Sequence, residues 1–554
     1  MSSSVLALLA FTPILVAAIL LVGFRLPAKK AMPLAFFITV VIAYFAWDIS
    51  LIHLLASSIQ GLFITFDILF IIFGAIVLLN ILKYSRAIVV IRQGFTSITE
   101  DRRIQVVIIT WLFGSFIEGA AGFGTPAAIV APLLVGLGFP TFCAVMLGMM
   151  VQSTAVTFGA VGTPILVGVS GGIQSPELTA ELTSSGLGFA DYIQLVTSEV
   201  VLLHGIAGVL MPTLMVCMMT RFFGKNKSWK EGLEVLPFTL LGGLAFVVPY
   251  AITGIFLGPE FPSLLGALVG IPIVVFAAKR GFLMPKKVWN FEEESKWPSH
   301  WIGTLNVKLN VADEKIKMSL IKAWVPYVLL AVLLVLSRLT HLPIKSWLLS
   351  VKVSWADIFG TSISAASTPL YLPGTILLVV SIITIMLHKM KLKAVKTAFS
   401  ESAKMLLGAG FVLIFTVPMV RIYINSGVNP SDIPGMPIAM AEFVAAKVGN
   451  IYPMFAPTIG ALGAFIAGSN TVSNLMFSLF QFGVATNLAM PTVVIVALQA
   501  VGAAAGNMIA IHNIVAASAT VGFLGKEGLI LKKTIIPTVY YLVVVGIIGL
   551  ILIA

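Results

Sequence analysis

The sequence predicts an all-α integral membrane protein with about 12 to 14 transmembrane helices, in two inverted repeats that contain broken or re-entrant helices. Three observations lead to this prediction. The 554-residue chain is 59% hydrophobic and only 10% charged, whereas about a quarter of the residues of a soluble domain are charged. Its apolar runs have the length that crosses a bilayer. Two glycine-rich segments that lie far apart in the chain also resemble each other.

Apolar runs of about 17 to 25 residues are long enough to cross a bilayer as helices. They lie near 5–24, 33–47, 61–82, 104–118, 192–220, 235–256, 262–278, 324–337, 372–388, 405–424 and 534–553. The regions 119–170 and 451–523 are also apolar, but Gly, Pro, Ser, Thr and Asn interrupt them. We therefore expect re-entrant or interrupted helices there. The sequence lacks the alternating ten-residue pattern of barrel strands, so every crossing is expected to be helical.

The net charge of +12 is distributed unevenly over the predicted loops. With Met1 outside, most of the 34 Lys and Arg residues fall in loops on one side, whereas Arg338, Lys345, Lys352 and Lys447 fall on the other. The basic loops lie near 25–30, 83–103, 221–230, 279–322, 389–404 and 526–533. This positive-inside asymmetry predicts a multi-pass protein of the plasma membrane, in a bacterium the inner membrane, with both termini outside. It also explains the basic composition without a nucleic-acid partner.

The longest polar segment, 280–322, divides the chain into an N-terminal transmembrane half (1–279) and a C-terminal one (323–554). We predict that this segment is a cytoplasmic connector, because it is too short and too charged to form a catalytic domain.

No enzyme and no cofactor are expected. The sequence has no nucleotide-binding, serine-hydrolase or zinc-protease motif, and Cys143 and Cys217 lack the paired spacing of a metal site. A membrane enzyme acting on a lipid-linked substrate would need the acidic run 292–294 and His300 of the connector. A solvated charge run is the favoured interpretation of that stretch.

An internal repeat organises the two interrupted regions. FIEGAAGFGTPAAIVAPLLVGLGFP (116–140) aligns with FIAGSNTVSNLMFSLFQFGVATNLAMP (465–491), which places Gly119 over Gly468. Downstream, QSTAVTFGAVGTPI (152–165) aligns with QAVGAAAGNMIAIH (499–512), and Gly159 falls over Gly506. In the predicted topology the first segment starts inside and the second outside, so the repeats are inverted. Secondary carriers with this architecture bind substrate and coupling ion near the bilayer midplane, between the repeats.

The helix breaks in these repeats predict a binding site for a small carboxylate. Helix N-termini at a break expose backbone N–H groups and a partial positive charge. The predicted substrate-binding residues are Gly119, Gly122, Gly124, Thr125, Ser469, Asn470, Thr471, Ser473, Asn474 and Asn513. The alternative is that the small residues only let neighbouring helices pack closely.

Three ionisable residues in apolar segments are functional candidates, because charge inside a membrane is costly. We predict that Glu118, beside the first glycine break, or His512, in the second repeat, carries a coupling proton. Glu118 at the water interface would instead cap a helix, and His512 is alternatively a substrate donor or a buried structural histidine. Arg421 either pairs with the substrate carboxylate or extends to the outer interface.

The segments EGAAGFGTPAAIV, AVTFGAVGTPI, GSNTVSNLMF and VGFLGKEG resemble the L-lactate permease family of bacterial monocarboxylate carriers, collinearly from about residue 10 to the C-terminus. The resemblance implies a fold of two inverted repeats and import of L-lactate, D-lactate or glycolate with protons across the inner membrane. Glu118 to Gly124 match the first family signature, and Gly468 to Asn474 match the second.

Two departures from the family pattern fall in the second repeat. GSNTVSN stands where many members have GSDTSSN, so Asn470 replaces an aspartate. GNMIAIHN stands where they have GKMISPQS, so Asn507 replaces a lysine, Ile511 a proline and His512 a glutamine. One acid and one base are lost together, which preserves the net charge of the pair.

The predicted function is therefore proton-coupled import of a small monocarboxylate, and lactate and glycolate are the favoured substrates. A Na⁺-coupled or proton-coupled carrier of another small organic anion is the alternative, since it would share the architecture. The sequence leaves open the oligomeric state and whether the motion is elevator-like displacement or rocking.

Overall fold

The computed structural model describes residues 2–24, 26–96, 98–122, 124–304, 318–339 and 342–553. Among these residues, 12 helical segments are long and apolar enough to cross a membrane, or 13 when a pair bent by 96° counts as one span. The predicted range of 12 to 14 is confirmed. Arg25, Phe123 and residues 305–317 of the predicted connector lie outside the described residues.

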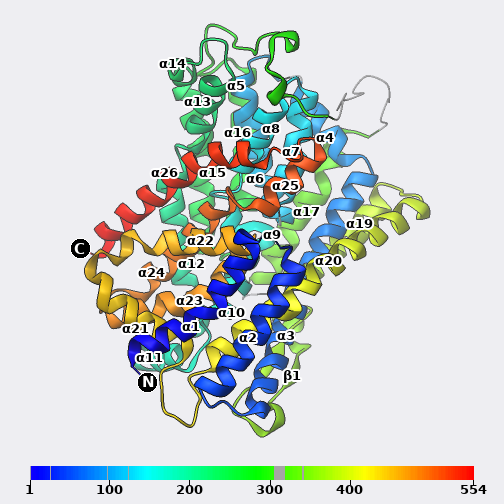
Figure 1. Cartoon of the computed structure of the whole chain (residues 1–554). Helices are drawn as coiled ribbons and strands as arrows, with labels where there is room; N and C mark the ends of the chain where they lie inside the picture. Colours follow the sequence, from blue (N-terminus) through cyan, green and yellow to red (C-terminus); the bar gives the residue numbers. More distant parts are fainter. Residues whose placement is uncertain are drawn as a thin grey trace.

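Two long helices lie at the centre of the group of helices on the right of Figure 1. These are α3 (Leu51–Tyr84) and α20 (Leu392–Asn425), each 34 residues long. They pack so closely that a Cβ on Gly61 would lie 2.5 Å from Pro418 Cα. The helices around them are α2 (Ala28–Ala46), α4 (Ala87–Thr96), α17 (Leu320–Arg338) and α19 (Pro373–Leu387). α1 (Ser3–Ala18) and η1 (Ile19–Gly23) precede α2, and α21 (Met436–Val448) packs against α1 at the lower left of Figure 1.

A second group of helices surrounds the interrupted regions. It contains α11 (Pro176–Ser185), α12 (Phe189–Gly208), α13 (Met211–Phe223), α14 (Trp229–Leu233), α15 (Leu236–Phe256), α16 (Pro262–Lys279) and α26 (Glu527–Ile553). The run expected as one span at 192–220 lies within one apolar segment, Phe189–Phe223, that is long enough to cross a membrane. Only Val209 and Leu210 separate α12 from α13 in this segment, and both keep right-handed helical φ and ψ angles.

Each interrupted region begins with a helical hairpin. In the first, α5 (Arg102–Gln105), η2 (Val106–Phe113) and α6 (Gly114–Ala121) run into a turn and return as α7 (Thr125–Gly136). In the second, η8 (Gly449–Met454) leads into α22 (Ala456–Ala467), which turns and returns as α23 (Asn470–Asn487). Both turns need positive φ, which glycine adopts without strain: 59° at Gly122, 76° at Gly124 and 71° at Gly468. The hairpins lie in different halves of Figure 1, α6 and α7 above and α22 and α23 below.

Each hairpin is followed by a broken helix. The first consists of α8 (Thr141–Met150), η3 (Val156–Phe158), α9 (Gly159–Thr163), η4 (Pro164–Val169) and α10 (Ser170–Ile173). Its break lies at Ala160, Val161 and Gly162, whose φ values of 42°, 55° and 78° are left-handed. The second consists of α24 (Thr492–Asn507) and α25 (Ile511–Thr520), with the break at 508–510. The predicted interruptions of 119–170 and 451–523 are thus confirmed.

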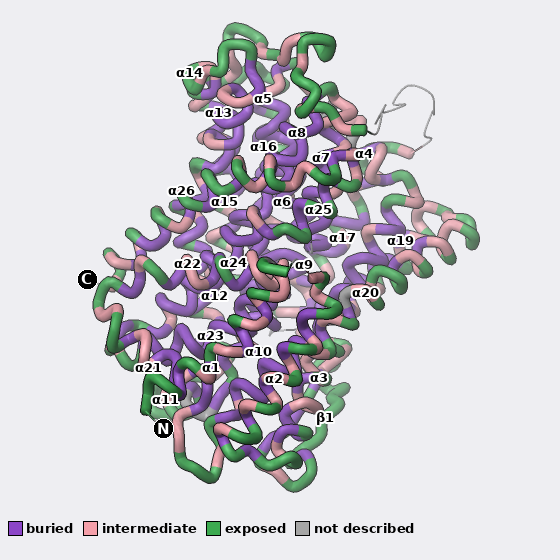
Figure 2. Tube along the Cα trace, viewed as in Figure 1, coloured by how far each residue is buried: buried purple, intermediate pink, exposed green. Residues whose placement is uncertain are grey.

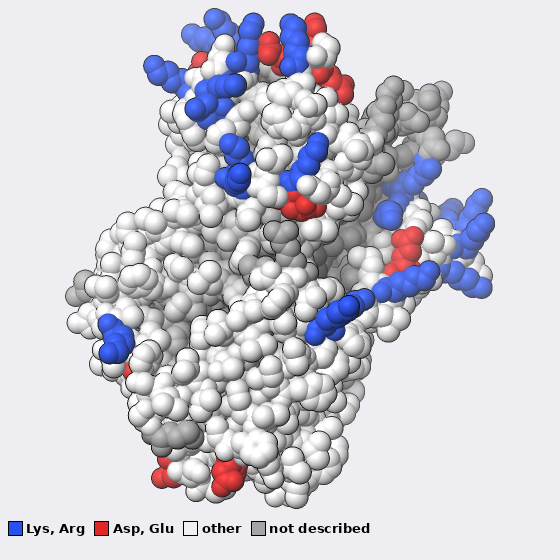
Figure 3. Space-filling view, in the orientation of Figure 1, with Lys and Arg blue, Asp and Glu red and all other residues white. Residues whose placement is uncertain are grey.

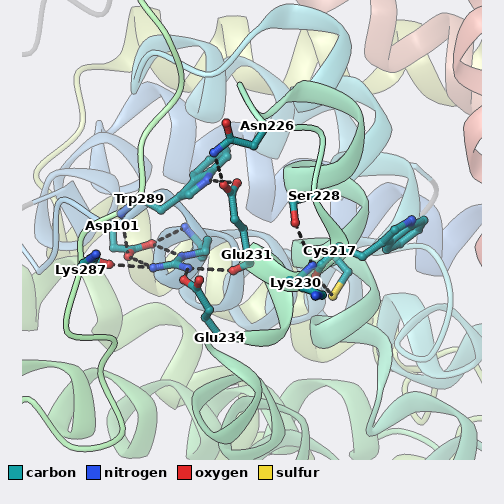
Figure 4. A network of polar contacts seen from close by, with 11 residues as sticks. Asp101, Cys217, Asn226, Ser228, Lys230, Glu231, Glu234, Lys287 and Trp289 are labelled. Atoms are coloured by element: carbon teal, nitrogen blue, oxygen red, sulfur yellow. Dashed lines mark hydrogen bonds and ion pairs between the residues drawn. The ribbon is translucent and has the colours of Figure 1, made fainter.

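The described part of the connector, residues 280–304, folds over one end of the helices. It contains the short turns η5 (Glu294–Lys296) and η6 (Ser299–Trp301). Trp289 donates its indole N–H to Glu231 and its backbone N–H to Asp101, which lies directly before α5 (Figure 4). Further along, Thr304 N donates to Gly522 O. The connector therefore ties the base of the first hairpin to α14 and to the loop before α26.

Basic side chains gather at the connector end and along the side where α19 meets α20, and far fewer lie at the opposite end (Figure 3). Both termini lie away from the connector end (Figure 1). Figure 2 shows the interior helices α6, α8 and α24 buried and the outer helices partly exposed. Beyond the expected helices, the segment after α17 forms α18 (Ile344–Ser350), η7 (Ile358–Gly360) and a two-stranded antiparallel ladder of β1 (Val353–Trp355) and β2 (Ala365–Ser367).

Candidate functional site

The tips of both hairpins and the breaks of both broken helices meet at one small pocket. Its volume is about 110 Å³, somewhat less than the roughly 150 Å³ of an engineered cavity that binds benzene. The lining residues are Glu118, Gly124, Val156, Gly159, Ala160, Thr163, Pro164, Gly468, Ser469, Asn470, Thr471, Asn507 and Asn513. The pocket suits a molecule of only a few heavy atoms.

Two helix N-termini face this pocket. The first is that of α7, preceded by Gly124, and the second is that of α23, preceded by Ser469, whose hydroxyl accepts from Val472 N at 3.5 Å. The first turn of a helix leaves backbone N–H groups without an intrahelical partner and carries a partial positive charge. At the start of α7, Thr125 N already donates to Gly122 O at 3.0 Å and Pro126 has no N–H. The N–H groups of Asn470 and Thr471 at the start of α23 can therefore donate to a small anion, and α7 adds its partial positive charge.

Two asparagines of the second hairpin donate hydrogen bonds to backbone carbonyl groups of the first broken helix. Asn470 Nδ2 donates to Val156 O at 3.0 Å, and Asn474 Nδ2 donates to Pro164 O at 3.2 Å. Both side chains are buried. A break in a helix leaves carbonyl groups without their usual partners, and leaving them unpaired inside the membrane is costly. The two amides supply those partners and join the repeats across the pocket.

Among the described residues that line the pocket, Glu118 alone carries an ionisable side chain. Its side chain is 1% exposed, and Oε2 accepts no hydrogen bond within the described part of the chain. On the opposite wall, the carboxyl group touches Gly159, the residue directly before the break. A buried carboxylate without a partner is expensive unless a proton or a cation neutralises it. Glu118 is thus chemically suited to binding a proton.

Amide side chains form the remaining polar wall. Gln152 Oε1 accepts from Asn507 Nδ2 at 2.6 Å and from Asn513 Nδ2 at 3.0 Å. These bonds join the first broken helix, through Gln152, to both pieces of the second. A Cβ on Gly124 would lie 2.8 Å from Asn513 Oδ1, so only glycine fits the hairpin tip at this point.

A family model described as L-lactate permease matches residues 6–554. The chain belongs to the L-lactate permease family. It is similar to the putative L-lactate permease of Haemophilus influenzae, with 30% identity over 93% of this chain and 92% of the relative. The L-lactate permease of Bacillus subtilis is 29% identical over 83% of this chain and 80% of its own length. The glycolate permease GlcA of Escherichia coli K12 is 29% identical over 98% and 95%.

Among solved structures, the Alcanivorax borkumensis YdaH transporter is similar to this chain with a TM-score of 0.38 and 11% identity. It covers 87% of this chain, which covers 84% of that structure.

Several predicted site residues of this L-lactate permease-family protein lie behind the pocket wall. Gly119 packs against the backbone of Ser263 and Leu264, and Gly122 packs against Ala160. Thr125 donates to Gly122 O at 2.7 Å and closes the tip of the first hairpin, while Ser473 donates to Gly460 O at 2.8 Å within the second. These residues shape the hairpins and do not line the pocket.

The structure separates Arg421 from the pocket. Arg421 is 2% exposed and lies on α20. Its guanidinium donates to Gln60 Oε1 at 2.7 Å and to the carbonyls of Gly171 and Gln174, at the end of α10, at 3.1 and 3.3 Å. Arg421 therefore does not line the pocket, and its guanidinium group connects α10 to the two long helices.

His512 is also absent from the pocket lining. Its ring lies against Gly468, where a Cβ would come within 2.5 Å of Nδ1. His512 stands at the start of α25 and its side chain is exposed. The proton-carrying candidates are thus not equivalent: Glu118 lines the pocket, and His512 supports the tip of the second hairpin from outside it.

The residues predicted from the sequence did not include Gln152, Val156, Gly159, Ala160, Thr163, Pro164, Gly468 and Asn507. Four of these carried a usable signal: the repeat alignment pairs Gln152 with Gln499, Gly159 with Gly506 and Gly468 with Gly119, and Asn507 departs from the family pattern. The others contribute backbone or small side chains at the break, and their position follows from how the two repeats pack.

Proposed function

We propose that this protein carries lactate or glycolate together with protons across the bacterial inner membrane. The observation that carries the proposal is the pocket at the two hairpin tips, where two helix N-termini and one unpartnered buried carboxyl group, Glu118, converge. The names of the relatives, L-lactate permease and glycolate permease, support the substrate class. The volume of about 110 Å³ supports a small substrate.

In the proposed mechanism the substrate carboxylate lies between the start of α7 and the start of α23. Backbone N–H groups at the start of α23 donate to it, the partial positive charge at the start of α7 stabilises it, and the hydroxyls of Ser469 and Thr471 add further donors. Glu118 takes up the proton, because it is the pocket's ionisable group. The substrate anion and the proton then cross as a neutral pair, which avoids moving an unpaired charge through a low-dielectric environment.

We further propose that the two hairpins and their broken helices are the two members of an inverted repeat, with both termini outside the cell. The hairpins enter from different halves of the molecule, and basic side chains concentrate at the connector end (Figure 3). These features support a cytoplasmic connector joining two transmembrane halves, as the positive-inside rule predicts.

The test is uptake of labelled L-lactate into liposomes that contain the purified protein, with an inward proton gradient and no Na⁺. We expect accumulation that a protonophore abolishes and that excess glycolate, but not succinate, suppresses. Accumulation that needs an inward Na⁺ gradient and ignores the proton gradient would contradict proton coupling. Absence of lactate and glycolate uptake by correctly folded protein would contradict the substrate assignment.

A further inference from the structure

Gln152, Asn507 and Asn513 form an amide cluster beside the pocket, and among the described residues one donor and one acceptor of this cluster have no partner. Gln152 is fully buried, and its Nε2 has no partner among the described residues, although its Oε1 accepts two bonds. Asn507 is 3% exposed, and its Oδ1 likewise has no partner there. Buried polar atoms are almost always hydrogen-bonded, so a pair left open beside a pocket indicates a missing partner.

The repeat provides an internal comparison for Gln152. Its counterpart in the second repeat, Gln499, is also fully buried. Gln499 Nε2 donates to Ser473 Oγ at 3.2 Å, and Gln499 Oε1 accepts from Gln481 Nε2 at 2.9 Å. Protein groups therefore satisfy the amide of Gln499 at both ends. The two glutamines occupy equivalent positions of the repeat, but only Gln152 has an amide donor without a partner among the described residues. The repeat position alone therefore does not explain the unpaired donor.

One of the two open atoms belongs to a residue that lines the pocket, and the other lies beside a lining residue. Asn507 lines the pocket itself. Gln152 Nε2 lies at the tip of the first hairpin, 3.9 Å from the position that a Cβ on Gly124 would occupy, and Gly124 lines the pocket. The two side chains are held together by the 2.6 Å bond from Asn507 Nδ2 to Gln152 Oε1. This bond fixes the orientation of both amide groups beside the pocket, and Gln152 Nε2 and Asn507 Oδ1 do not satisfy each other.

We propose that Gln152 and Asn507 recognise the 2-hydroxyl group of the substrate and make the pocket specific for 2-hydroxy monocarboxylates. A hydroxyl group is both donor and acceptor. It accepts from Gln152 Nε2 and donates to Asn507 Oδ1, while the carboxylate lies at the hairpin N-termini. A 2-oxo acid can only accept, and an acid without the oxygen can do neither. This inference rests on the proposed transport of small monocarboxylates. It adds that Gln152 and Asn507 distinguish 2-hydroxy acids from other monocarboxylates of similar size.

The test compares acids of matched size as competitors of labelled glycolate uptake into proteoliposomes. In the wild type we expect acetate to inhibit at least about tenfold more weakly than glycolate, and propionate and pyruvate at least about tenfold more weakly than L-lactate, because each leaves buried polar atoms unpaired. In Gln152→Met and Asn507→Leu these ratios should fall to about threefold or less, mainly through weaker inhibition by the hydroxy acids.

Gln499→Met is the matched control, because it removes the same amide from the other repeat. It should keep the wild-type ratios even if it lowers the amount of folded protein. Unchanged ratios in Gln152→Met, with uptake of all acids reduced equally, would show a structural role and overturn the inference. Equal inhibition by glycolate and acetate in the wild type would also overturn it, while leaving monocarboxylate transport standing.

A second readout needs neither variant. The melting temperature of the purified wild-type protein should rise with glycolate and L-lactate, and much less with equal concentrations of acetate and propionate. Equal shifts for all four acids would refute recognition of the hydroxyl group. If none of the acids is transported and none shifts the melting temperature, the proposed function itself fails.

Discussion

The carboxyl group of Glu118 on α6 contacts Gly159, the residue directly before the break in the first broken helix. A Cβ on Gly159 would overlap Glu118 Oε1 and lie 3.2 Å from its Cδ. The backbone of Gly159 is extended, with φ of −66° and ψ of 156°, so its conformation does not require glycine. Glycine is needed here for space, because any side chain would displace the carboxyl group of Glu118.

Gly159→Ala is therefore expected to impair transport without unfolding the protein. The added methyl group meets the end of a flexible side chain, so Glu118 must turn away from its place in the pocket. We expect lactate uptake to fall at least about tenfold, with a melting temperature close to that of the wild type. Gly205→Ala in α12 is the matched control, because nothing lies within 4 Å of its Cβ position. Equal uptake by Gly159→Ala and Gly205→Ala would mean that the position of the Glu118 carboxyl group is not critical.

The two proton-carrying candidates make opposite predictions. Glu118→Gln keeps the size and polarity of the side chain but cannot exchange a proton, so proton-driven accumulation of lactate should be lost while lactate exchange across the membrane persists. His512→Gln should retain accumulation, because His512 is not part of the pocket lining. In the wild type, accumulation should increase as the outside pH is lowered, since the proton is then the more abundant co-substrate. Accumulation by Glu118→Gln together with its loss in His512→Gln would reverse the assignment.

Arg421 is predicted to stabilise the protein without contacting the substrate. Arg421→Met removes the donors to the carbonyls of Gly171 and Gln174 and leaves them without the guanidinium. Hydrogen bonds to a charged group contribute about 1.5 to 3 kcal/mol each, so the thermal stability of the purified protein should fall clearly. Arg280→Met, at the exposed end of α16, is the control and should have little effect. Loss of substrate binding by Arg421→Met at unchanged stability would instead favour contact with the substrate carboxylate.

Arg103 is predicted to hold the connector against the first hairpin. It is 1% exposed, and it donates to Asp101 at 2.8 Å, Glu234 at 2.9 Å and Lys287 O at 2.8 Å. Figure 4 shows Asp101, Glu234 and Lys287 converging on this point. Removing one partner of a buried ion pair typically costs about 3 to 5 kcal/mol.

Arg103→Gln should therefore lower the melting temperature and expose the connector. Limited trypsin digestion measures this directly, because Lys286 and Lys287 lie in the connector, and we expect cleavage there to become several-fold faster. Lys225→Gln, an exposed substitution nearby, should leave the rate unchanged. Cleavage of Arg103→Gln at the wild-type rate would show that other contacts hold the connector.

The sequence by itself determined the membrane class, the number of spans and the positions where helices break. These features depend on local properties. Hydrophobic length decides whether a segment can span, and Gly122, Gly124 and Gly468 permit turns that other residues resist. The same local signals identified Glu118, Ser469 and Asn470 as candidates, and all three line the pocket.

The tertiary structure alone decided which polar groups meet. Asn474 bonds Pro164 O, Gln152 bonds Asn507, and Arg421 fastens α10, each across more than a hundred residues of sequence. A buried amide or guanidinium must find partners wherever the packing of distant helices leaves donors and acceptors unpaired. Sequence spacing carries no record of that packing, so Arg421 could not be assigned to a substrate or to a structural contact, and Gln152 could not be told apart from Gln499.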